Sequence, residues 1–253
     1  MQDVRYLDGV TVPTANAVRR TLVSRLPTPA IASVAVHSFD CCQHEEFVVH
    51  RLAMLPVVDE LCRSEAPAGD PVTMTLDVSC DSQTEFRVVT DRDLVAHTPS
   101  VRVWACEAPV EIARLRSGQR VHLTATVGWG TARQHAKFQQ VVTAFHRVVP
   151  RITVPAGVAP ADLRRACPRG VFDIEDVPDV NKCVDCGGCA GLGVEVSAGA
   201  KHQAGDASRR LRFEIEPLTS HRPAQFYVDR AVKVLLGDLD GLEADLGNLM
   251  RSF

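Results

Sequence analysis

Four of the nine cysteines are grouped in one short segment, at spacings that could hold a metal centre. Cys183, Cys186 and Cys189 follow one another as CxxCxxC, and Cys167 lies upstream, followed by Pro168. Three thiolates at two-residue gaps can wrap around one face of an iron–sulfur cube, and a remote Cys-Pro can supply the fourth ligand. The spacing therefore predicts one complete cluster site with these four cysteines as its ligands.

A second cluster, zinc and free thiols are the alternatives to this prediction. The position that would carry the Cys-Pro of a twin site is Gly193-Val194, so a second cluster is not predicted. Zinc also accepts four cysteine ligands, although structural zinc sites usually use two separated pairs. The compact triad favours an iron–sulfur cluster over zinc. Free thiols are the least favoured, because the surrounding segment is too polar to fold readily alone.

The other residues that could do chemistry form no catalytic arrangement in the sequence. The nine histidines are dispersed, and neither an HExxH motif nor a Ser/His/Asp set is evident. The glycine-rich run at 187–193 lacks the Lys-Ser/Thr pair of a phosphate-binding loop and follows no convincing strand. We expect these glycines to let the backbone wrap around a cluster, and we expect no catalytic residues in this chain.

The composition is that of a globular protein that does not hold nucleic acid by itself. The 253 residues are 45% hydrophobic and 23% charged, which suits one large domain or two to three small ones. The net charge of −3 lacks the positive excess of a direct nucleic-acid binder. The sequence has no run of about 18 apolar residues, and it begins without the apolar core of a signal peptide. We therefore expect an intracellular protein without a disulfide framework.

Two segments at the ends of the chain have the periodicity of amphipathic helices. In residues 13–26, apolar side chains recur every four positions at Val18, Leu22 and Leu26, and prolines follow. In residues 223–250, leucines at alternating steps of four and three make a short heptad seam, formed by Leu235, Leu239, Leu242, Leu246 and Leu249. Periodicity alone leaves open whether this seam packs inside the chain or against another subunit.

The pattern in the middle of the chain indicates an antiparallel sheet region followed by a small module. Strand-like or buried segments, several rich in Val and Thr, lie at 31–36, 47–49, 72–79, 101–105, 120–127, 141–145 and 211–216. The first six come without long helices between them, which favours antiparallel pairing. Residues 150–200 lose long apolar runs and gain Pro, Gly and Cys, so we expect something other than a core to hold them. Residues 201–210 are expected to form a linker or turn.

Six segments carry further recognisable motifs. Residues 9–31 contain Asn16, Ala17, Val18, Arg19 and Arg20 on the expected helix before a proline-marked turn. The next three segments are residues 45–57 with His50, Arg51, Leu52 and Pro56, the strand-like residues 73–94, and residues 118–141 with His135, Ala136, Lys137 and Phe138. The last two are the cysteine segment at 167–189 and residues 211–235.

In this order, the six segments resemble the alpha/D-type subunit family of DNA-directed RNA polymerases, which includes the archaeal D-type subunit and the eukaryotic third-largest subunit. Residues 9–31 are similar to the alpha motif of that family, and residues 73–94 to its insert-domain strands. The cysteine segment is similar to the ferredoxin-like module of the archaeal members, and residues 211–235 to the final strand and helix.

The resemblance implies an α+β fold with a discontinuous dimerisation domain at 1–30 and 195–253. It also implies an antiparallel β insert domain at 31–150 and a ferredoxin-like cysteine module at 151–194. That module would hold one structural iron–sulfur cluster, with zinc as the alternative. The terminal seam then becomes part of a subunit interface, formed by Val18, Leu22, Leu26, Leu235, Leu239, Leu242 and Leu246.

The function implied by the resemblance is that of a non-catalytic assembly subunit. Its two ends would pair with a smaller L-like subunit. The heterodimer would then dock the second-largest subunit and small zinc-bearing subunits, while the polymerisation chemistry would lie in the two largest subunits. Contact with DNA would be indirect, and no membrane would be involved. The protein would work in the cytoplasm or nucleus, depending on the host, or in a virion if it is viral.

The sequence departs from the family pattern at two places. The segment before the alpha motif is short, whereas family members usually have a further strand there, and Cys62 stands alone where the eukaryotic members have zinc-binding cysteines. Eukaryote-like insert strands beside an archaeal-like cysteine module suit a divergent lineage, such as a large DNA virus. Two alternative functions are an iron–sulfur electron-transfer protein or redox-enzyme subunit, and a homo-oligomeric scaffold built on the helix at 223–250.

Overall fold

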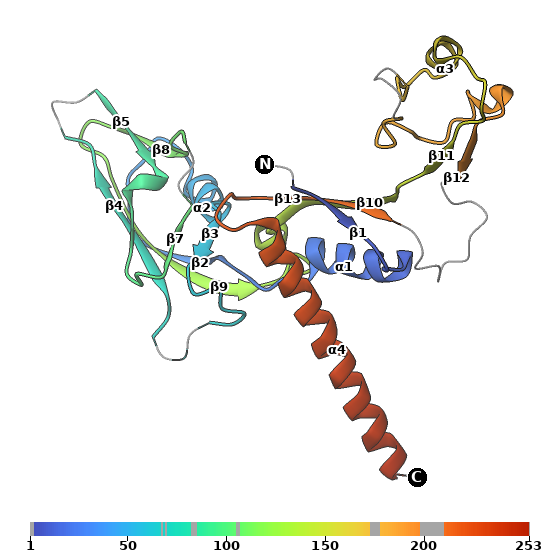
Figure 1. Ribbon diagram of the computed structural model, residues 1–253. Coiled ribbons are helices and arrows are strands. Elements are labelled where there is room, and N and C mark those ends of the chain that lie inside the picture. Colours follow the sequence, from blue (N-terminus) through green and yellow to red (C-terminus); the bar gives the residue numbers. More distant parts are fainter. Residues whose placement is uncertain are drawn as a thin grey trace. The chain divides into compact units, whose positions relative to one another are not determined.

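The computed structural model describes residues 3–66, 68, 70–81, 85–104, 107–172, 178–197 and 210–252. Cys106, most of the expected linker at 201–210, the end of the expected strand at 101–105 and part of the cysteine segment lie outside the described residues. The fold is mixed α/β with antiparallel sheets, as the sequence predicted (Figure 1). It divides into two compact units: Arg20–Val142 with Glu216–Phe253, and Gln2–Arg19 with Thr143–Ile215.

A four-stranded antiparallel sheet lies at the centre of the first unit. Its strands, in spatial order, are β2 (Thr28–Phe39), β9 (Arg120–Gly130), β4 (Thr73–Ser79) and β6 (Leu94–Ala96). Every second residue of β9 is buried from Val121 to Val127, which confirms the alternation seen in the sequence. The register pairs Leu123 of β9 with Leu76 of β4, and both side chains are fully buried in the core of this unit.

Shorter strands and one helix complete the core of the first unit. Two antiparallel pairs are formed by β5 (Phe86–Thr90) with β8 (Glu111–Arg116), and by β3 (Val57–Asp59) with β7 (Val101–Val103). The strand-like segment expected at 47–49 is instead part of a helix, α2 (Glu45–Ala53). Val48 and Leu52 lie four residues apart on one face of α2, and both pack into the sheet core. Single 3-10 turns occur at η1 (Asp91–Asp93), η2 (Ala136–Phe138) and η3 (Ala190–Leu192).

The second unit contains a three-stranded sheet and the cysteine segment. The sheet has the order β1 (Asp3–Leu7), β13 (Leu211–Pro217) and β10 (Val141–Val148). Strand β1 pairs antiparallel with β13, so a strand does precede the alpha motif even though the sequence there is short. The cysteine segment is flanked by the antiparallel pair β11 (Arg151–Thr153) and β12 (Glu195–Ser197), and contains the short helix α3 (Pro160–Ala166).

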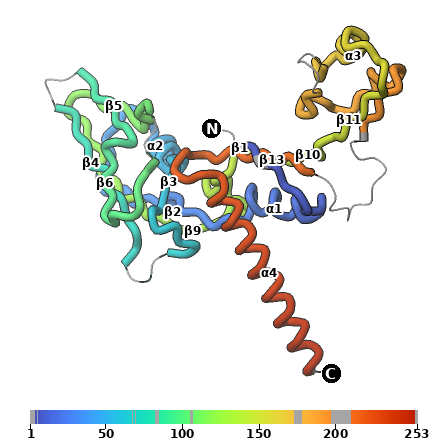
Figure 2. Tube along the Cα trace, viewed as in Figure 1, coloured from blue at the N-terminus to red at the C-terminus, as the bar shows by residue number. Residues whose placement is uncertain are grey.

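The two amphipathic helices predicted at the ends of the chain are both present. Helix α1 (Val12–Ser24) ends before Pro27, which cannot continue a helix. Helix α4 (Ala224–Ser252) has 29 residues and runs unbroken to the end of the described chain (Figure 2). None of the described helices, α4 included, combines the length and the apolar character that a membrane span requires.

Truncation of Leu123 is expected to lower the free energy of unfolding of the first unit by about 2–5 kcal/mol, because Leu123→Ala leaves a cavity in a close-packed core. Val95→Ala is the matched control, since Val95 on β6 is 60% exposed and its loss should change stability by less than about 0.5 kcal/mol. Urea unfolding followed by tryptophan fluorescence measures both variants. Equal effects would contradict the placement of the core on this face of the sheet.

Candidate functional site

The four cysteines predicted as cluster ligands line one pocket in the second unit. Cys167, Cys183, Cys186 and Cys189 all contribute to its wall, together with apolar side chains from the surrounding loops. None of the four is in a disulfide. Across the described ranges, no three Cys, His, Asp or Glu side chains lie close enough together to hold a metal ion. The four predicted ligands thus line one pocket, but their described side chains are too far apart to coordinate one ion together.

Local backbone geometry explains why this loop carries glycines. Gly187 has a φ of 75°, a left-handed conformation that glycine adopts without steric cost. A Cβ atom on Gly188 would lie 2.9 Å from the carbonyl oxygen of Ala166, so only glycine fits where the loop passes the end of α3. Helix α3 positions the remote cysteine, because the amide of Cys167 donates to the carbonyl of Leu163 over 3.1 Å. These contacts bring the triad and the remote cysteine to one pocket.

The electrostatics of the pocket suit a cationic group. Burial raises the pKa of the Cys189 thiol, and the neighbouring Cys167, Cys183 and Cys186 raise it further. A metal centre bound here would require these thiols to lose their protons, and its positive charge would then offset their mutual repulsion. The donor set, four soft sulfur ligands with an apolar wall, fits an iron–sulfur cluster or zinc.

The cysteine segment also has a small apolar core, which the sequence analysis did not expect. Buried side chains form this cluster, namely Leu163, Val171, Phe172 and Val194. Cys167, Cys183 and Cys189 pack against the cluster as partly buried neighbours. Four buried side chains are a small core for a segment of this size. Packing and a bound metal centre can therefore contribute together to the stability of this segment.

The second candidate feature is an apolar stripe on the C-terminal half of α4. Leu239, Leu242 and Leu246 are 60%, 56% and 51% exposed, respectively, while Leu235 is half-buried. Single exposed leucines are common on protein surfaces, but three at heptad spacing form one continuous apolar face. We call these three residues the leucine stripe. Leu249, the next residue of the predicted seam, is 54% exposed.

The rest of the predicted interface is covered by the chain itself to differing degrees. Leu22 and Leu26 are 1% and 2% exposed, and Val18 is half-buried. The N-terminal half of α4 also packs internally, and an ion pair between Arg25 and Asp238 joins its middle to the end of α1, with a 2.8 Å hydrogen bond between Nη2 and Oδ1. Beyond Asp238 the leucine stripe faces solvent.

Several of the remaining motif residues form hydrogen bonds within or between elements of the fold. The side-chain oxygen of Asn16 accepts hydrogen bonds from Nε and Nη2 of Arg19 over 3.0 and 2.9 Å. Lys137 donates from Nζ to the carbonyl of Ile31 over 2.7 Å, which ties η2 to strand β2. Arg51 of α2 donates to the carbonyl of Glu111 at the start of β8. These contacts give the motif residues structural roles.

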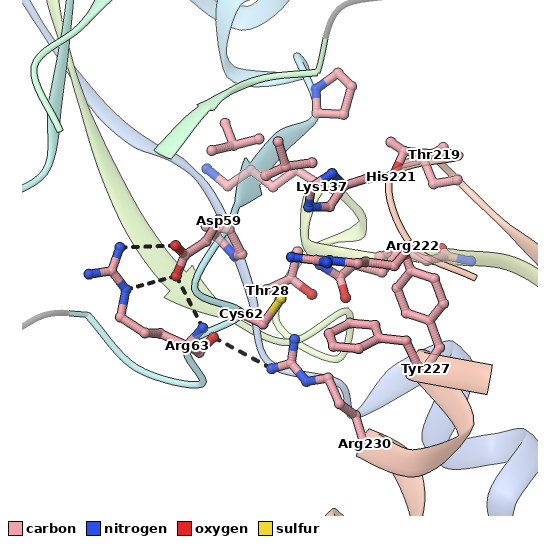
Figure 3. A pocket seen from close by; sticks show the side chains of 18 residues that line it. Thr28, Asp59, Cys62, Arg63, Lys137, Thr219, His221, Arg222, Tyr227 and Arg230 are labelled. Carbon is pink, nitrogen blue, oxygen red and sulfur yellow. Dashed lines mark hydrogen bonds and ion pairs between the residues drawn. The ribbon is translucent and has the colours of Figure 1, made fainter. Parts of the chain in front are cut away.

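One site was missed by sequence reasoning. A pocket in the first unit is lined by four basic residues, Arg63, Lys137, Arg222 and Arg230, which come from separate segments of the chain (Figure 3). Nothing in the local sequence around each residue indicates that they converge. A charge cluster assembled by the fold leaves no spacing pattern that could have revealed it.

Known proteins resemble this chain over most of its length, although no protein-family model matches it. The chain is 29% identical over 205 residues to DNA-directed RNA polymerase subunit Rpo3 of Methanosphaera stadtmanae, covering 75% of each chain. It is 29% identical over 208 residues to DNA-directed RNA polymerases I and III subunit rpac1 of Dictyostelium discoideum, covering 72% of this chain and 60% of that one. With the corresponding mouse (Mus musculus) subunit, RPAC1, the identity is 25% over 286 residues, covering 94% and 81%.

These relatives include both archaeal and eukaryotic polymerase subunits, which are the two groups that the sequence motifs resembled. The alignments reach beyond any single motif, because each of the three spans more than two thirds of this chain. The chain is thus similar, over most of its length, to members of the alpha/D-type subunit family of DNA-directed RNA polymerases.

Proposed function

We propose that this protein is a non-catalytic assembly subunit of a multisubunit DNA-directed RNA polymerase. The observation that carries the proposal is the leucine stripe in a chain whose relatives are polymerase subunits. An exposed apolar face of this kind is costly in water, and a partner helix that covers it stabilises both chains. The partner is a small L-like subunit, and the pair docks the second-largest subunit and small zinc-bearing subunits.

The proposed domains are a dimerisation domain at 1–30 and 195–253, an insert domain at 31–150 and a cysteine module at 151–194. The distribution of elements supports this division. Helices α1 and α4 lie in the two end segments, and the four-stranded sheet with α2 lies almost entirely within 31–150. All four cysteines of the second-unit pocket fall within 151–194.

The cysteine module holds one structural iron–sulfur cluster in this proposal, with zinc as the alternative. Cys167, Cys183, Cys186 and Cys189 supply the ligands, and their common pocket supports this assignment. The metal centre serves to fix the fold of the module, as structural metal sites do in small domains. Polymerisation chemistry belongs to the largest subunits, and the chain contacts DNA only through its partners, inside the cell where transcription takes place.

The alternative of an electron-transfer protein or redox-enzyme subunit is not favoured. It rests on the cysteine group alone, whereas the matching relatives are polymerase subunits over most of the chain. An electron carrier would need a partly exposed cluster that cycles between two oxidation states. The polymerase proposal requires only that the cluster hold the module in shape.

An anaerobic pull-down of the tagged chain from its host, with mass spectrometry of the partners and metal analysis of the eluate, tests this proposal. We expect a small L-like chain in a one-to-one ratio, together with the second-largest polymerase subunit, and iron or zinc in the eluate. Recovery of redox enzymes, or of the chain alone, would contradict the assembly role. A metal-free eluate that contains polymerase subunits would contradict only the cofactor assignment.

A further inference from the structure

A pocket in the first unit concentrates positive charge that the polymerase role does not explain. Its empty volume of about 530 Å³ includes space open to solvent. Four permanent cations line it, and the only carboxylate among its lining residues is Asp59 (Figure 3). The cations come from Arg63 after β3, Lys137 in η2, Arg222 just before α4 and Arg230 in the second turn of α4.

The single carboxylate is already engaged. Arg63 donates to both oxygens of Asp59, from Nε over 2.8 Å and from Nη2 over 3.0 Å, and also to the hydroxyl of Ser100 over 2.8 Å. Burial raises the pKa of Asp59, but the hydrogen bonds from Arg63 and from backbone amides outweigh it, so the pKa lies below its ordinary value. Asp59 and Arg63 therefore neutralise each other, and the other three cations remain.

Arg230 is held by uncharged hydrogen-bond acceptors alone. Its guanidinium group donates to the carbonyl oxygens of Pro27 and Arg63 over 3.1 and 3.5 Å, and lies 3.4 Å from the hydroxyl of Ser64. No carboxylate in the described part of the chain forms an ion pair with it. Burial lowers the pKa of Arg230, as expected for a cation removed from water without a counter-ion. Arg230 is half-buried, so its charge has lost part of its hydration without gaining an ion-pair partner in the described part of the chain.

Arg222 and Lys137 leave donors available on the same pocket. The Nη2 of Arg222 donates to the carbonyl of Glu60 over 3.0 Å, but its Nε is buried without a hydrogen-bond partner. The Glu60 carboxylate lies 3.7 Å from Arg222 and is shared with Arg102 at 2.9 Å and His221 at 3.5 Å. Lys137 bonds only to a backbone carbonyl and, among the described residues, has no acidic partner.

We propose that this pocket binds a multiply charged oxyanion of the phosphate class. Arg230, Arg222 and Lys137 would hold it, since guanidinium groups donate two parallel hydrogen bonds to phosphate oxygens and lysine adds a point charge. A monovalent carboxylate would leave most of the positive charge uncompensated, whereas phosphate or pyrophosphate balances it. The site lies within a single compact unit, and the inference does not depend on the proposed polymerase role.

Thermal unfolding of the full chain in phosphate-free buffer tests the site, with pyrophosphate as the probe and acetate at the same ionic strength as the comparison. We expect pyrophosphate at a hundredfold excess over its Kd to raise Tm by roughly 5 °C or more, because it binds only the folded chain. Acetate should have little effect. Arg230→Met should lose most of the pyrophosphate response, measured as the change from its own Tm without pyrophosphate.

Two further variants make the comparison decisive. Arg120→Met removes an arginine that pairs with Asp77 outside the pocket, over 2.8 Å, and should keep the full response. Lys137→Met should lower the affinity for pyrophosphate at least tenfold, as measured by calorimetry. If Arg230→Met does not fold, this second variant replaces it in the test. The proposal is overturned if wild type does not respond, if acetate acts as strongly, or if the pocket variants respond as Arg120→Met does.

Discussion

Leu242→Asp is expected to weaken pairing with a small L-like partner at least a hundredfold. The substitution places a carboxylate in the middle of the leucine stripe, where the partner would have to bury it against apolar side chains. A penalty of about 3 kcal/mol for an unpaired buried polar group corresponds to a factor of roughly one hundred in Kd. The fold of the chain should not change, because Leu242 is 56% exposed on its own surface. Isothermal titration calorimetry of the purified chains measures the effect.

Ala244→Asp is the matched control for this variant. Ala244 lies on the same exposed half of α4, two residues from Leu242 and therefore on a different face of the helix. The same carboxylate at this position should change the Kd less than about threefold, as expected of a residue outside the buried part of an interface. If Leu242→Asp pairs as tightly as Ala244→Asp, the leucine stripe is not the interface.

Cys183→Ser is expected to remove the bound metal centre and to unfold much of the cysteine module. Serine is a poor ligand for iron and zinc, and a structural metal site can contribute on the order of 10 kcal/mol to the folding of a small domain. The apolar cluster around Leu163 and Phe172 is too small to compensate for a loss of that size. Metal content should fall at least tenfold, and limited proteolysis should cleave within 151–194.

Cys42→Ser controls for the loss of a thiol elsewhere. Cys42 is exposed and belongs to the first unit, far in sequence from the predicted ligands. This variant should keep both its metal and its resistance to proteolysis. A Cys183→Ser chain that retains its metal and assembles with its partners like Cys42→Ser would show that the cluster has no structural role.

Elements with a strong local pattern were predicted correctly. The helices at both ends follow from leucine periodicity and from the prolines after α1, and β9 follows from strict alternation of apolar residues. The segment at 47–49 was misread because three residues cannot separate a strand period from a helix period. The acidic pair Glu45 and Glu46 before it, and the spacing of Val48 and Leu52, were signals for α2.

Elements that depend on distant partners were harder to predict. Strand β1 is short, and it is stabilised by pairing with β13 near the other end of the chain, which no local pattern reveals. The same holds for the cationic pocket, because Arg63 and Arg230 meet only in the folded chain. Cysteine spacing, by contrast, is local, so the sequence could indicate that these four cysteines lie together, and they line one pocket.

Periodicity also does not tell which surface covers an apolar face. Leu22, Leu26 and Leu242 all have helical spacing, yet the first two are buried in this chain and Leu242 is exposed. Helical spacing in the sequence therefore marks apolar faces but does not separate those that the chain itself covers. The structure makes that separation and leaves the leucine stripe exposed.

Native mass spectrometry of the chain co-expressed with a small L-like subunit tests the central claim most directly. The account predicts a one-to-one heterodimer that survives purification, because the leucine stripe is covered only by a second, smaller chain. A purified protein that remains a monomer beside that partner, or that forms a symmetric homodimer instead, would contradict it.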